Sequence, residues 1–414
     1  LYNVALTMAL LGPTPFAMRL TSAWWGLLLV ALTYAWTRRA FDRPTALWTA
    51  TGLALSFWGV STSRLGLRAI TLPALFTAAL LALMADRRRP TADGRSPSVI
   101  RCSPFATRYL LPGLLLGLTL YTYLAARLLP AIPLLFGFYL FLTDRRRWWQ
   151  RWRPWGVSLL VAALVAAPLF AYLQAHPSAE IRIGQLDQPL RLLLKGDPGP
   201  LMAKVYEGLH FFSFRGDGFI PYNIPGRPLF DPLTSLLFYA GLLIALRRWR
   251  EPAYALALLW LAVGFFPALA TGVDAAHLRA IAAQPVLYLF PALTLERLRT
   301  DGLRRAVPRP VVPLLVLLAF APVALLTPAG LLPPLAQRPR RAGPLPRGPD
   351  GHRRGGAPGT GGGAGRHLQL LPRPVPRSPH LAGRAGRGQP AAALVRRSPS
   401  SLPPPRSDGP PHPA

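Results

Sequence analysis

The sequence predicts an all-α integral membrane protein, a polytopic helical bundle of about ten transmembrane helices. Hydrophobic residues make up 51% of the 414 residues and charged residues only 15%, a balance that soluble domains rarely show. Several apolar runs approach the length of about 20 residues that a helix needs to cross a bilayer. Arginines gather in the loops between these runs, where membrane proteins keep their positive charge.

The apolar runs are separated by short loops rich in arginine, proline or glycine. The predicted spans are 16–37, 45–62, 67–85, 108–125, 128–143, 154–173, 232–246, 252–271, 279–294 and 310–327. Residues 1–11, LYNVALTMALL, indicate a helix at the membrane surface or the end of a further span.

Loop charge gives an independent test of these spans. Every second short loop is rich in arginine, and these loops together hold 21 arginines. They are 38–44, 86–107, 144–153, 247–251 and 295–309. The intervening short loops hold only Arg64, Arg127 and Arg279, with Arg68 just inside the next span. The positive-inside rule places the arginine-rich loops in the cytoplasm and the long loop 174–231 outside it, in a multi-pass protein of the plasma membrane.

A net charge of +31 is also typical of nucleic-acid-binding proteins. We exclude nucleic acid as a partner, because the arginines of the body lie between apolar runs. The chain has a single cysteine, Cys102, so no internal disulfide can form.

The C-terminal tail differs from the multi-span domain of residues 1–335. Residues 336–414 contain 14 Arg, 2 Asp and 17 Pro, with no Lys, Glu or aromatic residue. Such a segment cannot bury a core and is expected to be disordered. Alternatively it is a frameshift product of a GC-rich gene. Because the chain starts at Leu1 rather than Met, we expect it to begin inside a longer gene product.

Arginines at the outer ends of spans are candidates for binding phosphate. Arg64 and Arg68 are four residues apart, which places both on one face of a helix. Two guanidinium groups there could hold a phosphate or diphosphate headgroup. The alternative is that they reach out to lipid phosphates, as we expect of Arg19.

A second candidate is the sequence GVDAAHLRAI, with Asp274, His277 and Arg279. Asp274 and His277 are three residues apart and could share a metal ion or a proton. The alternative is a solvated turn in which Asp274 is the N-cap of the ninth span.

The third candidate is the stretch 211–232, FFSFRGDGFIPYNIPGRPLFDP. Asp217 lies between glycines, and YNIPGRP predicts an ordered turn rather than a strand. Asn223, Arg227 and Asp231 could contact a sugar or a phosphate. The alternative is a structural cap over the outer end of the bundle, with the phenylalanines at 211, 212, 214 and 219 packed on it.

The N-terminal region resembles the membrane region of bacterial family 39 glycosyltransferases, members of the GT-C superfamily related to the dolichyl-phosphate-mannose–protein mannosyltransferases. The resemblance lies in a surface helix followed by GPTPFAMRL, a span with small residues, a short arginine loop, and a span ending in Ser63-Arg64. The segment GDGFIPYNIPGRPLFDPLTSLLFYAGLLIAL also resembles the outer loop and next span of some members.

This resemblance implies a GT-C-like fold and transfer of a sugar from a polyprenyl-phosphate donor to an extracytoplasmic acceptor, a protein, lipid or glycan, by inverting displacement. It implies that a carboxylate of the first outer loop activates the acceptor; that residue is expected before Leu1, so the catalytic residue is not in this chain. Arg64 matches the motif, whereas Arg68 stands where many relatives have an acid. The physics agrees, because arginines at the interface stabilise charge on a departing lipid phosphate, and an outer loop excludes water.

Two other classes of protein stay open. A transporter or flippase of a lipid-linked or anionic solute should show broken spans or ionisable residues near the midplane, whereas here the charges lie at span ends. An inactive gene fragment is the other. No metal-binding motif is present, although a divalent metal is possible. The expected partners are membrane lipids and the polyprenyl-phosphate-linked donor.

Overall fold

A computed structural model describes residues 2–84, 109–176, 188–219 and 222–302. By its internal contacts the chain divides into Leu1–Arg341 and Ala342–Ala414, and all described residues belong to the first unit. The last predicted span, 310–327, and the tail lie outside the described residues. All regular elements of the described part are helices.

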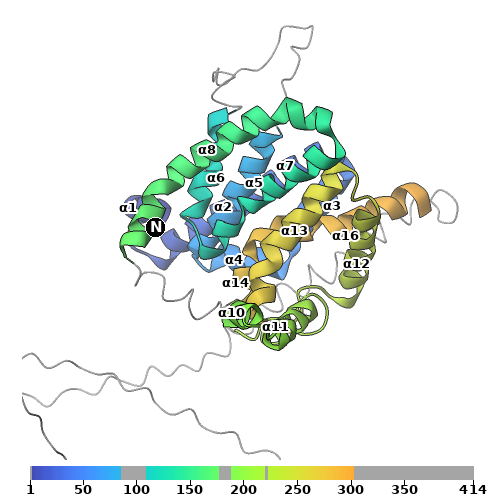
Figure 1. Cartoon of the computed structure of the whole chain (residues 1–414). Coiled ribbons are helices and arrows are strands. Elements are labelled where there is room, and N and C mark those ends of the chain that lie inside the picture. Colours follow the sequence, from blue (N-terminus) through green and yellow to red (C-terminus); the bar gives the residue numbers. More distant parts are fainter. Residues whose placement is uncertain (1, 85–108, 177–187, 220–221, 303–414) are drawn as a thin grey trace, which may run out of the picture. The chain divides into compact units, whose positions relative to one another are not determined.

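The first half of the bundle begins with the helix α1 (Tyr2–Leu11), which confirms that residues 1–11 are helical, and the long helix α2 (Pro15–Ala40). The helices α2, α5, α6 and α8 are neighbours in that order, each packed against the next (Figure 1). The remaining elements of this half are α3 (Arg43–Leu55), α4 (Phe57–Arg64), η1 (Arg68–Ile70), α5 (Thr71–Leu83), α6 (Leu111–Leu120), η3 (Leu124–Leu128), α7 (Ala131–Thr143) and α8 (Arg145–Ala175).

The long loop 174–231 contains two helices that were not predicted from the sequence, α10 (Gln188–Leu194) and α11 (Gly199–His210). The second half of the bundle follows. It consists of α12 (Pro232–Arg247), α13 (Pro252–Thr271), α14 (Ala276–Arg279), η5 (Ile281–Ala283), α15 (Gln284–Leu287), α16 (Leu289–Arg297) and the π-helical turn η6 (Leu298–Gly302).

Large aromatic side chains hold the two halves together. Trp36 of α2 and Phe76 of α5 both meet Trp260 of α13 edge to face, at ring-centroid distances of 4.9 and 5.3 Å. The Trp260 indole donates to the Ala282 carbonyl at 2.8 Å. Edge-to-face contacts of this kind add to the burial of apolar area, so this cluster fixes α13 against the N-terminal helices.

Four helices of the described residues are long and apolar enough to cross a membrane, judged by length and composition. They are Pro15–Ala40, Leu124–Thr143, Arg145–Ala175 and Pro252–Thr271. Several further predicted spans are occupied by shorter apolar helices, and the total of about ten stays a prediction. Two predicted spans are broken: 45–62 ends and restarts at Ser56, and 279–294 is divided among η5, α15 and α16, after α14.

Candidate functional site

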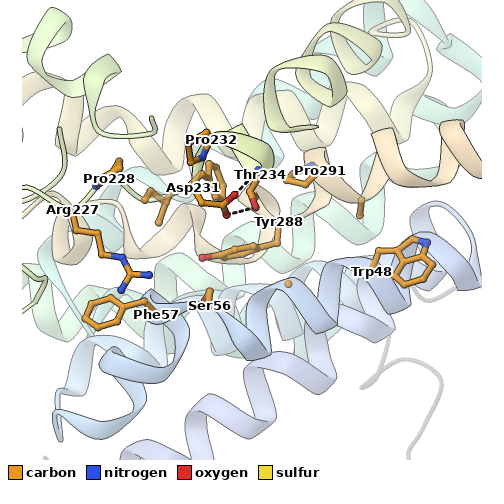
Figure 2. Close-up of a pocket in the computed structure, with 14 residues that line it drawn as sticks. Trp48, Ser56, Phe57, Arg227, Pro228, Asp231, Pro232, Thr234, Tyr288 and Pro291 are labelled. Atoms are coloured by element: carbon orange, nitrogen blue, oxygen red, sulfur yellow. Dashed lines mark hydrogen bonds between the residues drawn. The ribbon is translucent and has the colours of Figure 1, made fainter. Parts of the chain in front are cut away.

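A cavity of about 240 Å³ opens beside the break between α3 and α4 (Figure 2). Three parts of the chain that are distant in sequence form its walls. They are the α3–α4 break, the end of the loop 174–231 with the start of α12, and the region where α15 meets α16. The lining residues are Trp48, Gly52, Ser56, Phe57, Arg227, Pro228, Leu229, Phe230, Asp231, Pro232, Thr234, Tyr288, Pro291 and Ala292.

At the break between α3 and α4, the Ser56 side chain forms hydrogen bonds with nearby backbone groups. Its hydroxyl donates to the Leu53 carbonyl at 2.9 Å and accepts from the Gly59 backbone N–H at 2.9 Å, so Ser56 is the N-cap of α4. A Cβ at Gly59 would lie 2.4 Å from the Leu53 carbonyl oxygen, so the chain needs a glycine there. Because unsatisfied backbone groups are costly in a membrane, these bonds allow the span to break beside the cavity.

Arg227 reaches the cavity from a tight turn. Its backbone N–H donates to the Ile224 carbonyl at 2.9 Å, and Pro225 and Gly226 hold the two central positions, with Gly226 at φ 77°. This is the pattern of a type II turn, and it confirms the ordered turn predicted for YNIPGRP. The Arg227 guanidinium lies 4.8 Å from the ring centroid of Phe57, a cation–π distance.

The surroundings of Arg227 keep a positive charge in the cavity. Burial lowers the pKa of Arg227, while the neighbouring Tyr288 and Asp231 act in the opposite direction and raise it. Arginine stays protonated in proteins even when its pKa is lowered. A half-buried cation therefore lies on an aromatic ring in the wall of the cavity.

Tyr288 supplies a second polar group to the same cavity. The side chain is 5% exposed. Within the described part of the chain no hydrogen bond of good geometry reaches its hydroxyl, although the Ser56 side chain lies beside it. Figure 2 shows that its oxygen points toward the side of the cavity where Arg227 and Ser56 lie. Buried hydroxyls nearly always have a partner, so this one is a candidate donor to a ligand.

Asp231 lines the cavity as an N-cap. Its Oδ1 accepts from the backbone N–H groups of Leu233 and Thr234, both at 3.1 Å, and its Oδ2 accepts from the Thr234 hydroxyl at 2.5 Å. These bonds fix the start of α12. The carboxylate therefore has a structural task that competes with a role as a base.

Asp217 lies at the centre of a buried hydrogen-bond network that joins the loop 174–231 to the start of α14. Its Oδ1 accepts from the backbone N–H groups of Phe219 at 2.8 Å and Ala275 at 2.9 Å, and its Oδ2 from that of His277 at 3.3 Å. The imidazole Nδ1 of His277 is 3.6 Å from Oδ2. Both side chains are buried, with 0% and 1% exposure.

In this network the pKa values of Asp217 and His277 both lie below their ordinary values. Burial raises the pKa of Asp217, but the adjacent His277 and the backbone N–H groups outweigh it, so the net pKa lies below its ordinary value. Burial lowers the pKa of His277 more than Asp217 raises it. The imidazole packs edge to face against Trp58 and Phe211, at centroid distances of 5.4 and 4.8 Å, in surroundings that favour its neutral form.

Asn223 connects this hydrogen-bond network to Arg227. Its amide donates to the backbone carbonyls of Asp217 at 3.0 Å and Arg227 at 2.7 Å. A Cβ at Gly216 would lie 1.8 Å from the Arg227 carbonyl oxygen, so the two segments approach too closely for a side chain. Together these contacts form a clasp, which we define as residues 216–217 held against Asn223, Gly226 and Arg227.

The structure thus brings together Asp217, Asn223 and His277 and places Arg227 on the cavity. The prediction that Asp274 is the N-cap of the ninth span is wrong. Asp274 is exposed, and the N-cap of α14 is Ala275, at φ 55° and without a side-chain bond. Asp217 supplies the acceptors instead, from far away in the sequence. Asp274 and His277 therefore do not form the predicted pair, since the carboxylate beside His277 is that of Asp217.

The prediction that Arg64 and Arg68 share one helical face is also wrong. The helix α4 ends at Arg64, the chain turns through Gly66 at φ 70°, and Arg68 begins η1. Both side chains are exposed. Arg68 borders a separate cleft of about 580 Å³ that Thr21 and Ser22 also line.

The other predicted residues have different settings. Arg279 lines a mostly apolar groove of about 260 Å³ together with Arg127, and it donates to the Thr271 carbonyl and hydroxyl at 3.2 and 2.7 Å. The cap formed by four phenylalanines is confirmed for Phe211 and Phe212, which are buried, but wrong for Phe214 and Phe219, which are exposed. The described residues contain no group of three His, Cys, Asp or Glu side chains placed to hold a metal ion.

Sequence reasoning missed Tyr288, Ser56 and Phe57. Each lies within a predicted span, where hydroxyls and aromatic rings are common. The one available signal was the small and polar character of Ser56 and Gly59 in an otherwise apolar run. That signal indicates a break only after the partner elements are known.

The arrangement of the helices is similar to that of a solved membrane glycosyltransferase. The all-helical membrane fold predicted from the sequence is therefore confirmed, and the predicted GT-C resemblance agrees with this likeness. The similar structures are those of an oligosaccharyltransferase from Archaeoglobus fulgidus. Its complex with zinc and sulfate matches at a TM-score of 0.52 and 19% identity, over 80% of this chain and 43% of that one. Its complex with an inhibitory peptide and a dolichol-phosphate matches at 0.50 and 17%, over 79% and 47%.

ArnT from Cupriavidus metallidurans, bound to undecaprenyl phosphate, matches at a TM-score of 0.45 and 17% identity, over 79% of this chain and 60% of that one. No family model and no curated protein matches the sequence. The match spans less than half of the archaeal enzyme. At identities this low the match shows the fold alone, and the activity of this chain is therefore a proposal.

Proposed function

We propose that this chain is the membrane region of an inverting glycosyltransferase, which transfers a sugar from a polyprenyl-phosphate donor to an acceptor on the extracytoplasmic side of the plasma membrane. One observation carries the proposal: within a GT-C-like fold, a cationic Arg227 and the buried Tyr288 hydroxyl converge on one cavity at a broken span. One of the similar structures contains a dolichol-phosphate.

In the proposed reaction, the acceptor oxygen or nitrogen attacks the sugar C1 and the bond from C1 to the phosphate oxygen breaks. The negative charge that develops on this oxygen remains on the departing lipid phosphate. Arg227 stabilises that charge by a charge-assisted hydrogen bond and Tyr288 by donating its O–H, an electrostatic effect that is large in a water-poor site. The exposed Arg64 and Arg68 and the half-buried Arg279 supply further positive charge at the ends of spans.

The acceptor proton must go to a base. Asp231 and Asp217 are both occupied by bonds to backbone N–H groups, so neither is proposed as that base. The family resemblance assigns this role to an acidic residue of the first outer loop, which no residue of this chain matches. Asp217, Asn223 and His277 act as positioning residues for Arg227.

The test measures binding of undecaprenyl phosphate to the full chain in lipid nanodiscs. Arg227→Ala is expected to weaken binding by about ten- to a hundredfold, because one hydrogen bond to a charged group contributes about 1.5–3 kcal/mol. Tyr288→Phe removes one oxygen atom and is expected to weaken binding less. Arg215→Ala is the matched control, since Arg215 is an exposed arginine of the same loop. Equal affinities of the Arg227 and Arg215 variants would contradict the proposal.

A transporter or flippase is the second candidate, favoured by the broken spans at 45–62 and 279–294. Broken helices often mark transport sites. A donor labelled in the sugar separates the two functions in proteoliposomes. A transferase moves the label from the lipid to an acceptor, whereas a flippase changes its leaflet while the bond between sugar and phosphate stays intact.

A further inference from the structure

A second cavity of about 220 Å³ lies at the arginine-rich end of the bundle. It is formed where α2 and α5 end, α8 and α13 begin, and α7 passes between them. The lining residues are Arg39, Ala40, Leu80, Leu83, Met84, Pro133, Phe136, Leu140, Arg147, Arg151, Trp155, Pro252, Ala253 and Leu256.

Three arginines converge on this cavity from two helices. Arg39 is in the last turn of α2, and Arg147 and Arg151 are four residues apart in the first turns of α8, a spacing that places both on one face. Among the described residues that line the cavity, none is acidic. The Asp144 carboxylate, just outside the lining, contacts Arg147 at 3.0 Å. The described lining of the cavity therefore carries three guanidinium groups and no carboxylate.

The rest of the lining is apolar. Leu80, Phe136 and Leu140 are buried side chains of the same lining. A soluble anion such as inorganic phosphate has no part that would use such a surface. A molecule with a phosphate at one end and hydrocarbon at the other matches both halves of the lining.

The aromatic residues of α8 indicate the depth of this cavity in the membrane. Trp149 and Trp152 are exposed on the same turns that carry Arg147 and Arg151. Arg153 lies over the Trp152 ring at 5.5 Å. Tryptophan and arginine together are typical of the interface between headgroups and acyl chains, which is where a phospholipid phosphate lies.

We propose that this cavity binds an anionic phospholipid, with the headgroup phosphate on Arg39, Arg147 and Arg151 and an acyl chain on the apolar wall. Basic pockets between transmembrane helices bind anionic lipid headgroups by the same physics. The site is separate from the Arg227 cavity and shares no lining residue with it. It therefore does not depend on the proposed transferase activity.

The test titrates the delipidated full chain, in detergent, with phosphatidylglycerol, with phosphatidylcholine and with inorganic phosphate, and counts bound lipids by native mass spectrometry. The variant Arg39→Ala/Arg151→Ala removes two charges from the cavity. Its matched control, Arg38→Ala/Arg153→Ala, removes two neighbouring charges from the same two helices that do not line it. Ala253→Phe fills the cavity and keeps every charge.

We expect tight binding of phosphatidylglycerol, weaker by about tenfold or more in the Arg39/Arg151 variant and unchanged in its control. Ala253→Phe is expected to reduce binding as well, and it provides the answer if the double variant does not fold. Equal losses in both double variants would show a general effect of surface charge and overturn the proposal. Equal binding of phosphatidylcholine, or inorganic phosphate displacing the lipid at millimolar concentration, would overturn it too.

Discussion

The buried carboxylate of Asp217 allows a direct test of how the loop 174–231 contacts the start of α14. Asp217→Asn keeps the shape of the side chain but removes its charge and replaces one acceptor oxygen by an NH₂ group. Three backbone N–H groups, those of Phe219, Ala275 and His277, donate to this carboxylate. We therefore expect the substitution to disrupt the start of α14 and the adjoining loop.

The magnitude follows from these bonds. Hydrogen bonds to a charged group contribute about 1.5–3 kcal/mol and neutral ones about 0.5–1.5 kcal/mol. Loss of the charge across three bonds to a carboxylate with 0% exposure therefore costs about 3 kcal/mol. This corresponds to an increase on the order of a hundredfold in the opening equilibrium of the segment.

Hydrogen–deuterium exchange of residues 272–280 measures that equilibrium directly, since local opening exposes the amides. The control is Asp274→Asn, which makes the same chemical change at an exposed carboxylate of the same segment. We expect a change of at most about 0.5 kcal/mol for the control. If both variants exchanged at the wild-type rate, the assignment of Asp217 as the distant cap of α14 would be refuted.

Two further predictions concern stability. Burial lowers the pKa of His277, so below a pH of about 6.5 the unfolded chain binds a proton that the folded chain does not bind, and stability should fall as the pH drops through that value. Thermal unfolding at pH 7.5 and at pH 5 measures this dependence. The variant His277→Gln should lose part of it, whereas His176→Gln, at an exposed histidine, should keep it. A Cβ at Gly241 would lie 1.8 Å from the Phe290 carbonyl oxygen, so Gly241→Ala should separate α12 from α16 and lower the unfolding temperature, at a cost of about 1–3 kcal/mol. Gly156→Ala, in α8 with nothing within 4 Å, should not lower it, and equal shifts of the two variants would contradict the close approach.

The sequence was sufficient to predict the helices α12 and α13, because each depends on local features. The predicted span 252–271 coincides with α13, and 232–246 differs from α12 by one residue. Both helices have a proline in the first turn after an acidic residue, Glu251 or Asp231, a combination that starts helices. Apolar length and these signals lie within one segment of the chain.

The breaks could not be predicted in this way. Ser56 stands in an apolar run, and its bonds to Leu53 and Gly59 become informative only when the neighbouring elements are known. The N-cap of α14 shows the same limit more sharply. Sequence reasoning placed the carboxylate at the nearest acidic residue, Asp274, whereas Asp217 reaches α14 through the fold. Local sequence indicates that a helix start needs an acceptor, but it does not indicate which distant residue supplies it.

The clasp links the cavity to residues that do not touch it. The Gly226 N–H donates to the Asp217 carbonyl at 3.3 Å and the Gly216 N–H to the Gly226 carbonyl at 3.2 Å, so the turn that presents Arg227 is bonded to the segment that carries Asp217. The same Asp217 carboxylate caps α14, and the chain then continues to Tyr288. Arg227 and Tyr288 therefore depend on one buried carboxylate for their relative position. It follows that Asp217→Asn should weaken binding of undecaprenyl phosphate although Asp217 does not line the cavity, and that Asp274→Asn should not.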